Sequence, residues 1–232
     1  MNQPRVTVYR RPVVAIMATG DELVLPGSPC GPGQIHASNS FGLGALVEAA
    51  GGIARLMPIA RDTEGSLKAV FSLTEGADLI VTIGGASVGD HDLVGPVARD
   101  LGMEQSFYKV AMRPGKPLMA GRLGATPMVG LPGNPVSSIV CGHIFLRPAL
   151  AVLQGLEAAP LPRQPAPLAH DIDTNGPREH YMRARLGSDG VTVFDRQDSS
   201  LVSVLADANA LAVRPPTDGP RKAGEMVDAI TF

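Results

Sequence analysis

The sequence predicts a three-layer α/β domain built on a mainly parallel sheet, followed by a small β-barrel or sandwich domain. Two features of the 232-residue chain carry this prediction. Up to residue 155, apolar segments of strand length alternate with segments of helical period, which is typical of βαβ units. Beyond residue 167 the segments are β-rich and separated by Gly, Asp and Pro. We therefore expect domains at 1–155 and 168–232, joined by a stiff proline-rich linker at 156–167.

Strands of the first domain are expected where apolar and β-branched residues run without interruption, at 13–18, 53–60, 78–83, 105–111, 118–120 and 127–131. Helices are expected where apolar residues recur every three or four positions, at 39–50, 63–74, 93–101 and 134–153. Ligands of parallel sheets bind beyond the carboxyl ends of the strands. The turns that follow the strands should therefore gather at one edge of the sheet.

Composition excludes several functional classes. Hydrophobic residues make up 44% and charged residues 18%, and the net charge of −2 gives no basic footprint for nucleic acid or an anionic membrane. The apolar stretch 136–153 is interrupted by His143, Arg147 and Pro148, and the N-terminus lacks the apolar core of a signal peptide. Cys30 and Cys141 are too few for a disulfide framework or a zinc site. We expect a soluble cytoplasmic protein.

A glycine-rich loop follows the strand expected at 78–83. The N–H groups of Gly84 and Gly85 can approach an anion without a Cβ in the way, and Gly89 adds a third such position. Ser87 offers a hydroxyl, and Asp92 places a carboxylate at the edge of the same loop. A phosphate cradle beside a ligand for a hard cation is what a phosphorylated, metal-assisted substrate needs.

Two other interpretations of this loop stay open. Residues 85–89 match the G-x-S-x-G nucleophile elbow of hydrolases, in which Ser87 would attack the substrate. His170 or His180 would then have to supply the base from beyond the linker. Alternatively, the glycines serve only to pack the strand tightly against the next helix. A lone G-x-S-x-G is weak evidence, and we favour the phosphate cradle.

A cationic cluster and a helix start offer further anion-binding groups. Lys109, Arg113 and Lys116 lie within eight residues, and Pro114 and Gly115 fix a turn between them. Such a cluster is either an oxyanion site or a solvated surface. The turn Pro132-Gly133-Asn134 puts a helix N-terminus directly after a strand, where free N–H groups favour an anion. This turn could equally be an ordinary capped strand–helix connection.

Carboxylates follow three of the expected strands. Magnesium is usually held by one or two carboxylates together with substrate oxygens. Asp92 is our first candidate for a magnesium ligand and Glu22 the second. Asp21 and Asp62 lie in similar positions, although Asp62 could simply cap a helix.

Five motifs in consistent order resemble the molybdopterin molybdenumtransferases of the MoeA/gephyrin-E type. They are T-G-D-E-L at 19–23, G-Q-I at 33–35, G-G-x-S-x-G-x-x-D at 84–92, R-P-G-K-P at 113–117 and G-L-P-G-N-P-V-S at 130–137. The resemblance covers residues 10–155, and residues 160–232 resemble the C-terminal domain of the family more weakly. It implies a molybdopterin-binding α/β fold followed by an all-β barrel.

The resemblance also implies a reaction. Adenylylated molybdopterin and molybdate bind, the adenylyl group is hydrolysed with Mg²⁺ to release AMP, and molybdenum enters the dithiolene. By position in the motifs, the catalytic residues would be Asp92, Glu22, Asp62 and Lys109, with Asp92 and Glu22 on the metal. The residues expected to bind the substrate are Thr19, Gly20, Asp21, Gly84, Gly85, Ser87, Gly89, Arg113, Pro114, Gly115, Lys116, Pro132, Gly133, Asn134 and Ser137.

Three features depart from the family pattern. We expect its elongated N-terminal region, which contributes to the cleft and to the dimer, to be missing, so that a homodimer contact or a partner subunit supplies it. Arg113 stands where some members have Lys, and residues 36–39 replace a segment that often carries an acidic residue. The alternative function is therefore a truncated, non-catalytic module that binds the molybdopterin nucleotide.

Overall fold

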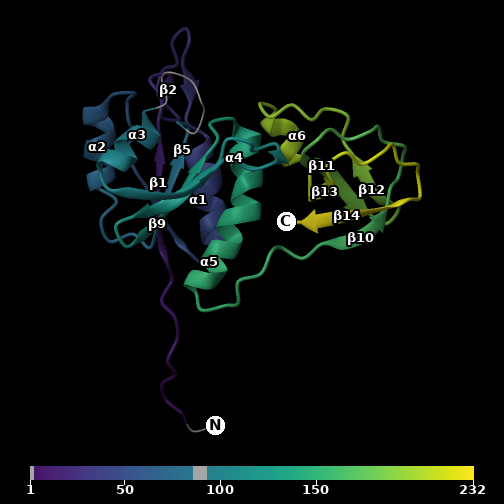
Figure 1. Ribbon diagram of the computed structural model, residues 1–232, viewed down its shortest axis with the longest axis horizontal. Coiled ribbons are helices and arrows are strands. Elements are labelled where there is room, and N and C mark those ends of the chain that lie inside the picture. The colour runs from purple at the N-terminus through teal and green to yellow at the C-terminus, as the bar shows by residue number, and fades with distance from the viewer. Residues whose placement is uncertain (1–2, 86–92) are drawn as a thin grey trace.

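A six-stranded sheet forms the centre of the first domain in the computed structural model, which describes residues 3–85 and 93–232 (Figure 1). The strands lie in the order β4-β1-β5-β9-β8-β6. The four parallel neighbours are β4 (Ile53–Leu56), β1 (Val13–Ala18), β5 (Leu79–Ile83) and β9 (Thr126–Leu131). The antiparallel strand β8 (Met119–Leu123) lies between β9 and β6 (Met103–Tyr108). Because β8 is antiparallel to both of its neighbours, β6 and β9 run in the same direction.

Helices cover both faces of this sheet (Figure 1). One face carries α1 (Asn39–Ala49) and a long helix made of α4 (Pro135–Cys141), η1 (Gly142–Leu146) and α5 (Arg147–Leu153). The other face carries α2 (Glu64–Ser72) and α3 (Val94–Asp100). The neighbouring strand residues Ile16 and Met17 enter opposite cores, as the period of two along a strand requires. The predicted three-layer α/β fold is confirmed.

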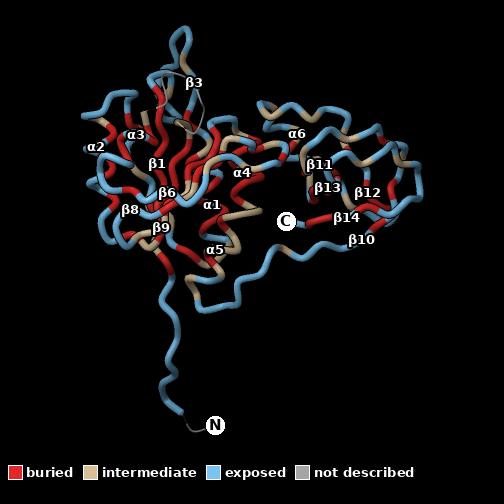
Figure 2. The backbone as a smooth tube through the Cα atoms, viewed as in Figure 1, coloured by how far each residue is buried: buried red, intermediate tan, exposed pale blue. Residues whose placement is uncertain are grey.

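The long helix contains a π-helical turn at Gly142–Leu146, just before Pro148. Proline has no backbone N–H, so an irregular turn of this kind accommodates it without ending the helix. The span Pro135–Leu153 is long and apolar enough to cross a membrane by length and composition alone. Here Val136, Val140 and Leu150 are fully buried against the sheet side, so the segment serves as a core helix (Figure 2).

A second sheet forms the C-terminal domain, with strands in the order β10-β14-β13-β11-β12. Their bounds are β10 (Gln164–Pro167), β11 (Glu179–Gly187), β12 (Gly190–Val193), β13 (Ala210–Arg214) and β14 (Met226–Thr231). The two outer strands meet through a bridge between Leu168 and Val191 and a 3.0 Å bond from Ala169 N to Val191 O. This contact closes the sheet into a small barrel, which we call the barrel. The helix α6 (Val202–Ala206) lies between β12 and β13.

Several local boundaries differ from the sequence prediction. The strand β10 lies within the stretch expected to be a linker, since an outer strand tolerates prolines that a central strand would not. The strand expected at 53–60 ends at Leu56, with a single bridge at Ala60. A small parallel pair, β2 (Leu23–Val24) and β3 (Ile35–His36), projects beyond the sheet edge (Figure 1).

The barrel is joined to the first domain by backbone pairing and by a shared core. The short strand β7 (Met112–Arg113) pairs in parallel with the start of β11. Tyr181 and Leu211 of the barrel belong to the same hydrophobic cluster as Leu118 and Val136 of the first domain. The long helix lies between the sheet and the barrel in Figure 1. The two domains are therefore packed together and not merely linked.

Candidate functional site

The turns that follow the parallel strands meet at one edge of the sheet. Thr19 N, directly after β1, donates to Ile83 O at 3.0 Å, and Gly84 N, directly after β5, donates to Leu131 O at 3.1 Å. Gly20 N donates to the carbonyl of Ala60 at 3.1 Å. We call this edge, with its turns, the carboxyl edge. The expected gathering of these turns is present.

Close backbone packing limits which residue types fit at the carboxyl edge. Gly84 has φ +88°, and a Cβ there would lie 3.0 Å from Thr19 O. A Cβ on Gly133 would lie 3.6 Å from the Cα of Gly84, and Asn39 Nδ2 donates to Gly133 O at 2.7 Å. The backbone at position 84 therefore requires glycine, because a Cβ would press on the turn after β1; this packing is against the turn of a neighbouring strand and not against the next helix. Ser87, Gly89 and Asp92 lie outside the described residues.

Three carboxylates, those of Asp21, Glu22 and Asp62, follow the strands β1 and β4. The Glu22 side chain folds back over Gly20, whose Cβ, if present, would lie 2.5 Å from Glu22 Oε2. Asp21 Oδ1 accepts a 3.2 Å bond from the backbone N–H of Asp62, which fixes the two loops against each other. The helix cap is Thr63, whose hydroxyl accepts from Ser66 N at 3.3 Å, and not Asp62.

These carboxylates fit magnesium better than a transition metal. Within residues 3–85 and 93–232, no group of three or more His, Cys, Asp or Glu side chains is placed to hold a metal ion. A closed protein cage is therefore lacking in the described part of the chain. Magnesium does not need one, because it usually takes one or two carboxylates and completes its shell with water and substrate phosphates. Among the described residues, Glu22 and Asp62 would hold it.

The cationic cluster lies on a rigid loop that leaves the same edge. Because β6 runs parallel to β9, its end at Tyr108 faces the carboxyl edge, and Lys109 follows directly with φ +71°. Lys109 N donates to Leu118 O at 2.8 Å. Lys109 Nζ stands 5.0 Å from the centre of the Tyr108 ring, within cation–π range. We call residues 109–117 the cation loop.

The base of the cation loop packs on a buried thiol. Gly115 has φ +107°, and a Cβ there would lie 2.4 Å from Cys141 Sγ. Cys141 is fully buried, and burial raises its thiol pKa to about 12. Cys141 is therefore an inert core residue. The peptide bond between Arg113 and Pro114 is cis.

A cavity of about 590 Å³ opens between the cation loop and the barrel. We call it the interdomain cavity. Arg113, Lys116 and Ser137 line it from the first domain, and Arg178 and Ser199 are among its lining residues from the barrel. Arg178 and Ser199 were not among the residues singled out in the sequence. No local spacing could have identified them, because they reach the cavity only through the packing of the barrel on the long helix.

The start of α4 is already occupied by the barrel. Val136 N donates to Ser199 O at 3.1 Å, and Asn134 Nδ2 donates to Ser199 Oγ at 3.0 Å. The sequence pattern led us to expect an N-cap from Asn134 and free N–H groups here. Instead the Asn134 side chain makes no capping bond, and one of the N–H groups is bonded across the domain boundary. The start of α4 thus has fewer free N–H groups to offer an anion than its position predicts.

A buried arginine holds the barrel loop that reaches this helix. Arg183 is 2% exposed and lies on β11. Its guanidinium donates to Gln197 Oε1 at 3.2 Å, to Asp198 O at 2.6 Å and to Arg196 O at 3.2 Å. Burial lowers the pKa of this arginine, and the charge of nearby Asp198 offsets only part of that shift. Residues 196–198 are therefore fixed from inside the barrel, next to Ser199.

The two histidines that the hydrolase interpretation needs both lie in the barrel. Both ring nitrogens of His170 face backbone carbonyls, at 3.0 Å from Asp171 O and 2.9 Å from Val193 O. His180 is 6% exposed, and its pKa falls to about 4 through burial and the nearby arginines, beginning with Arg113. The ring of His170 is thus held by carbonyls of the barrel itself.

Comparison with known proteins places the chain in a family. Residues 15–152 match the family model described as a probable molybdopterin binding domain, and residues 165–232 match the MoeA C-terminal region, domain IV. A molybdopterin molybdenumtransferase of a Nostoc strain is 39% identical over 222 residues, covering 91% of this chain and 51% of the relative. The chain belongs to the molybdopterin molybdenumtransferase family.

Further relatives and a solved structure support this family membership. The Haemophilus influenzae protein of that name is 32% identical, over 98% of this chain and 58% of its own length. The crystal structure of a molybdopterin biosynthesis MoeA protein from Pyrococcus horikoshii superimposes with a TM-score of 0.83 at 30% identity. It covers 96% of this chain and 55% of that protein. The chain thus spans about half the length of the relatives it matches.

Proposed function

We propose that this chain takes part in molybdenum cofactor biosynthesis by inserting molybdate into adenylylated molybdopterin, with magnesium-dependent release of AMP. The observation that carries the proposal is the placement of two unlike groups at one sheet edge. Carboxylates stand at the ends of β1 and β4, and the cation loop stands at the end of β6. The proposed reaction needs both groups. The carboxylates would hold the magnesium ion on the phosphoanhydride, and the cation loop would hold the oxyanion beside it.

The described residues suggest a division of labour along the carboxyl edge. Glu22 and Asp62 would hold magnesium, which supplies charge neutralisation at the phosphate oxygens while water cleaves the anhydride to AMP. Lys116 and Arg113 would bind molybdate in the interdomain cavity, where arginine offers a planar fork and lysine a point charge. The two thiols of the dithiolene would then displace oxygen ligands of molybdate, with loss of water. Lys109 would lie between these sites.

The remaining assignments belong to the same proposal. Thr19, Gly20, Asp21, Gly84 and Gly85 would line the nucleotide side, and Asp92 would join Glu22 on the metal. The barrel would close the molybdate side with Arg178 and Ser199. We also propose that a second copy of the chain or a partner subunit completes the cleft, and that the reaction takes place in the cytoplasm.

Assay of the two half-reactions tests the proposal. The purified chain is supplied with adenylylated molybdopterin, molybdate and Mg²⁺, and AMP and pterin-bound molybdenum are measured separately. We expect Asp62→Asn to lower AMP release and Lys116→Ala to lower molybdenum incorporation, each by about tenfold or more. Lys68→Ala, which removes an exposed helix cation paired with Glu64, is the matched control. Equal activity of Lys116→Ala and Lys68→Ala would overturn the assignment of the cation loop.

A non-catalytic module that binds the molybdopterin nucleotide is the alternative function. The same assay distinguishes the two functions. Tight binding of the adenylylated substrate without AMP release selects the module, whereas AMP release that depends on Asp62 selects the transferase.

A further inference from the structure

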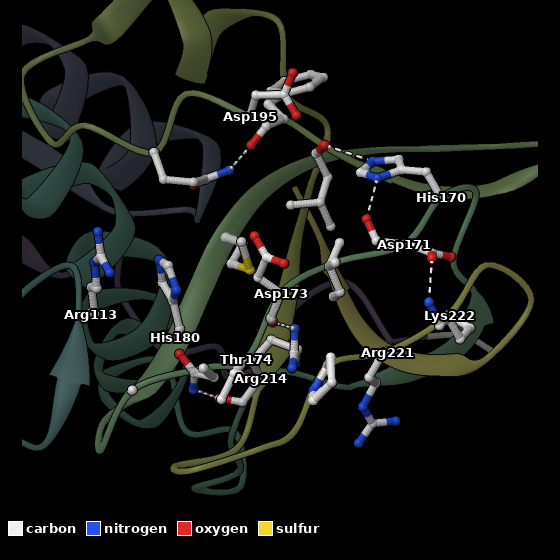
Figure 3. A pocket seen from close by; sticks show the side chains of 18 residues that line it. Arg113, His170, Asp171, Asp173, Thr174, His180, Asp195, Arg214, Arg221 and Lys222 are labelled. Carbon is white, nitrogen blue, oxygen red and sulfur yellow. Dashed lines mark hydrogen bonds and ion pairs between the residues drawn. The ribbon is translucent and has the colours of Figure 1, made fainter.

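A second cavity, of about 540 Å³, opens at one end of the barrel (Figure 3). We call it the mouth cavity. Its walls come from the loop 170–176, the ends of β12 and β13, the start of β11 and residues 220–222. Arg113, Asp195 and Gln197 line both this cavity and the interdomain cavity. The mouth cavity is therefore a continuation of the proposed molybdate site into the barrel.

The positive charges on the barrel side of the mouth cavity are bound within the protein. Arg214 donates to Asp218 and to the carbonyls of Asp173 and Gly219. Arg221 pairs with the same Asp218, at 2.9 Å and 3.0 Å. Lys222 Nζ lies 2.8 Å from Asp171 Oδ2. Each of these three cations has a carboxylate partner, with Arg214 and Arg221 sharing Asp218, so their charge is largely offset and the barrel side of the cavity is less suited to bind another anion.

Hydrogen-bond acceptors, in contrast, remain available. The carboxylate of Asp173 lines the cavity and makes no side-chain hydrogen bond within the described part of the chain, since only its carbonyl is used by Arg214. The ring of His180 also lines the cavity. It is 6% exposed and has no hydrogen-bond partner among the described residues. Its low pKa keeps the ring neutral at pH 7, so one nitrogen can accept and the other can donate.

An apolar wall completes the mouth cavity. Ile172 and Val193 are 8% and 4% exposed, and Met182 and Phe194 line the cavity beside them. A flat hydrophobic ring can lie against such a wall, while its edge reaches the polar groups. A small inorganic anion or a bare cation would gain nothing from these four side chains.

We propose that the mouth cavity binds a flat, uncharged nitrogen heterocycle through the Asp173 carboxylate and the His180 ring. Two neighbouring N–H donors on one ring edge match the two oxygens of a carboxylate, in the same way as the fork of an arginine does. A 2-amino-4-oxopyrimidine edge carries such a pair, whereas adenine offers one amino group beside a ring acceptor. The chemistry therefore favours the pterin over the adenine of the substrate.

This inference rests on the proposed function, because it assigns the pterin end of the same substrate. With the pterin in the mouth cavity, the dithiolene would reach the cation loop through the wall shared with the interdomain cavity. The adenylyl group would extend toward Glu22 and Asp62. The barrel would then recognise the cofactor precursor itself, in addition to closing over molybdate.

Binding of free pterin tests the inference without any turnover. Pterin fluorescence can be followed directly during titration with the full chain, which contains no tryptophan. We expect saturable binding that Asp173→Asn weakens by about tenfold or more, because an amide turns one acceptor into a donor facing the N–H groups. Asp189→Asn, in the turn between β11 and β12 at the other end of the barrel, should bind pterin as the unmodified chain does.

Three outcomes would overturn the inference: equal pterin binding by Asp173→Asn and Asp189→Asn, displacement of bound pterin by AMP, or no pterin binding at all. His180→Phe is a second test, because phenylalanine keeps a ring at position 180 and removes only the ring nitrogens. We expect it to weaken pterin binding too. Failure of the proposed function looks different. In that case pterin binding remains sensitive to Asp173, while molybdate insertion and AMP release are missing.

Discussion

The side-chain amide of Asn134 donates to the hydroxyl of Ser199 at 3.0 Å, which ties the start of the long helix to a loop of the barrel. The neighbouring bond from Val136 N to Ser199 O doubles this link. Ser199 also lines the interdomain cavity. The position of the barrel over the cation loop therefore depends on a few polar contacts at one residue, in addition to the shared hydrophobic core.

Ser199→Ala should weaken this link. We expect a loss of about 0.5 kcal/mol in the free energy of unfolding, because the exposed Asn134 amide exchanges its hydroxyl acceptor for water. Urea denaturation followed by circular dichroism measures it. Ser203→Ala, on the exposed side of α6, is the control and should change stability by less. A smaller loss for Ser199→Ala than for Ser203→Ala would contradict the importance of the contact.

Arg183→Met should cost about 3 kcal/mol or more of unfolding free energy, since methionine fills the space but leaves the carbonyls of Asp198 and Arg196 without a donor and Gln197 Oε1 with the backbone N–H alone. Arg185→Met is the matched control on the same strand. Arg185 is exposed and makes one bond, to Asp207 O. Chemical denaturation of the two variants should separate them clearly. If both lose equally little, the guanidinium does not hold the loop.

Gly115→Ala should destabilise the cation loop by about 2–4 kcal/mol, because it combines a positive φ with a clash against Cys141 Sγ. Gly124→Ala, at φ +59° with open space around it, isolates the backbone cost and should lose about 1 kcal/mol. Combining Gly115→Ala with Cys141→Ala removes the clash. The double variant should therefore lose less than the sum of its single losses. Strict additivity would show that the thiol is not what Gly115 avoids.

Stability should fall as the pH drops from about 6.5 to about 4. Burial, with a smaller contribution from Arg147, lowers the pKa of His143 to about 4, and its ring lies against Phe232 with centroids 4.5 Å apart. A histidine whose folded pKa is depressed stabilises the fold above its unfolded pKa and loses that contribution as the pH falls through the folded value. The expected loss is on the order of 1–3 kcal/mol.

His143→Phe should reduce the slope of this part of the pH profile without abolishing it. The substituted ring can still stack on Phe232 and cannot be protonated, whereas buried His180, whose pKa is also lowered to about 4, still titrates. His36→Gln, at an exposed position, should leave the slope unchanged. Denaturant midpoints measured between pH 4 and pH 7 give the comparison. An unchanged slope in His143→Phe would assign the acid sensitivity to another group.

How much the sequence predicted depends on whether the relevant signal is local. The run 78–83 and the glycines after it predict a buried strand and a tight turn, and Gly84 stands where that turn requires it. Asn134 also looks like a local cap, yet its side chain bonds to a residue 65 positions away. Buried Arg183 gives no warning in the sequence, because its acceptors are mostly carbonyls, which every residue carries.

The carboxyl edge was predictable for a similar reason, since strand ends in a parallel sheet fall at one side by topology. The barrel's share of the interdomain cavity was not, because Arg178 and Ser199 reach it only through packing between domains. The glycine-rich loop beyond Gly85, with Ser87 and Asp92, stays a prediction.

The pairing of β7 with β11 has a mechanical consequence. Met112 and Arg113 belong to the first domain by sequence, but their backbone extends the sheet of the second. A rotation of the barrel would carry Arg113 along with it, and with it one wall of each cavity. The width of the cleft can therefore change only when the cation loop bends at its two ends. The contacts that the cation loop would make with an oxyanion then change together with the angle between the domains.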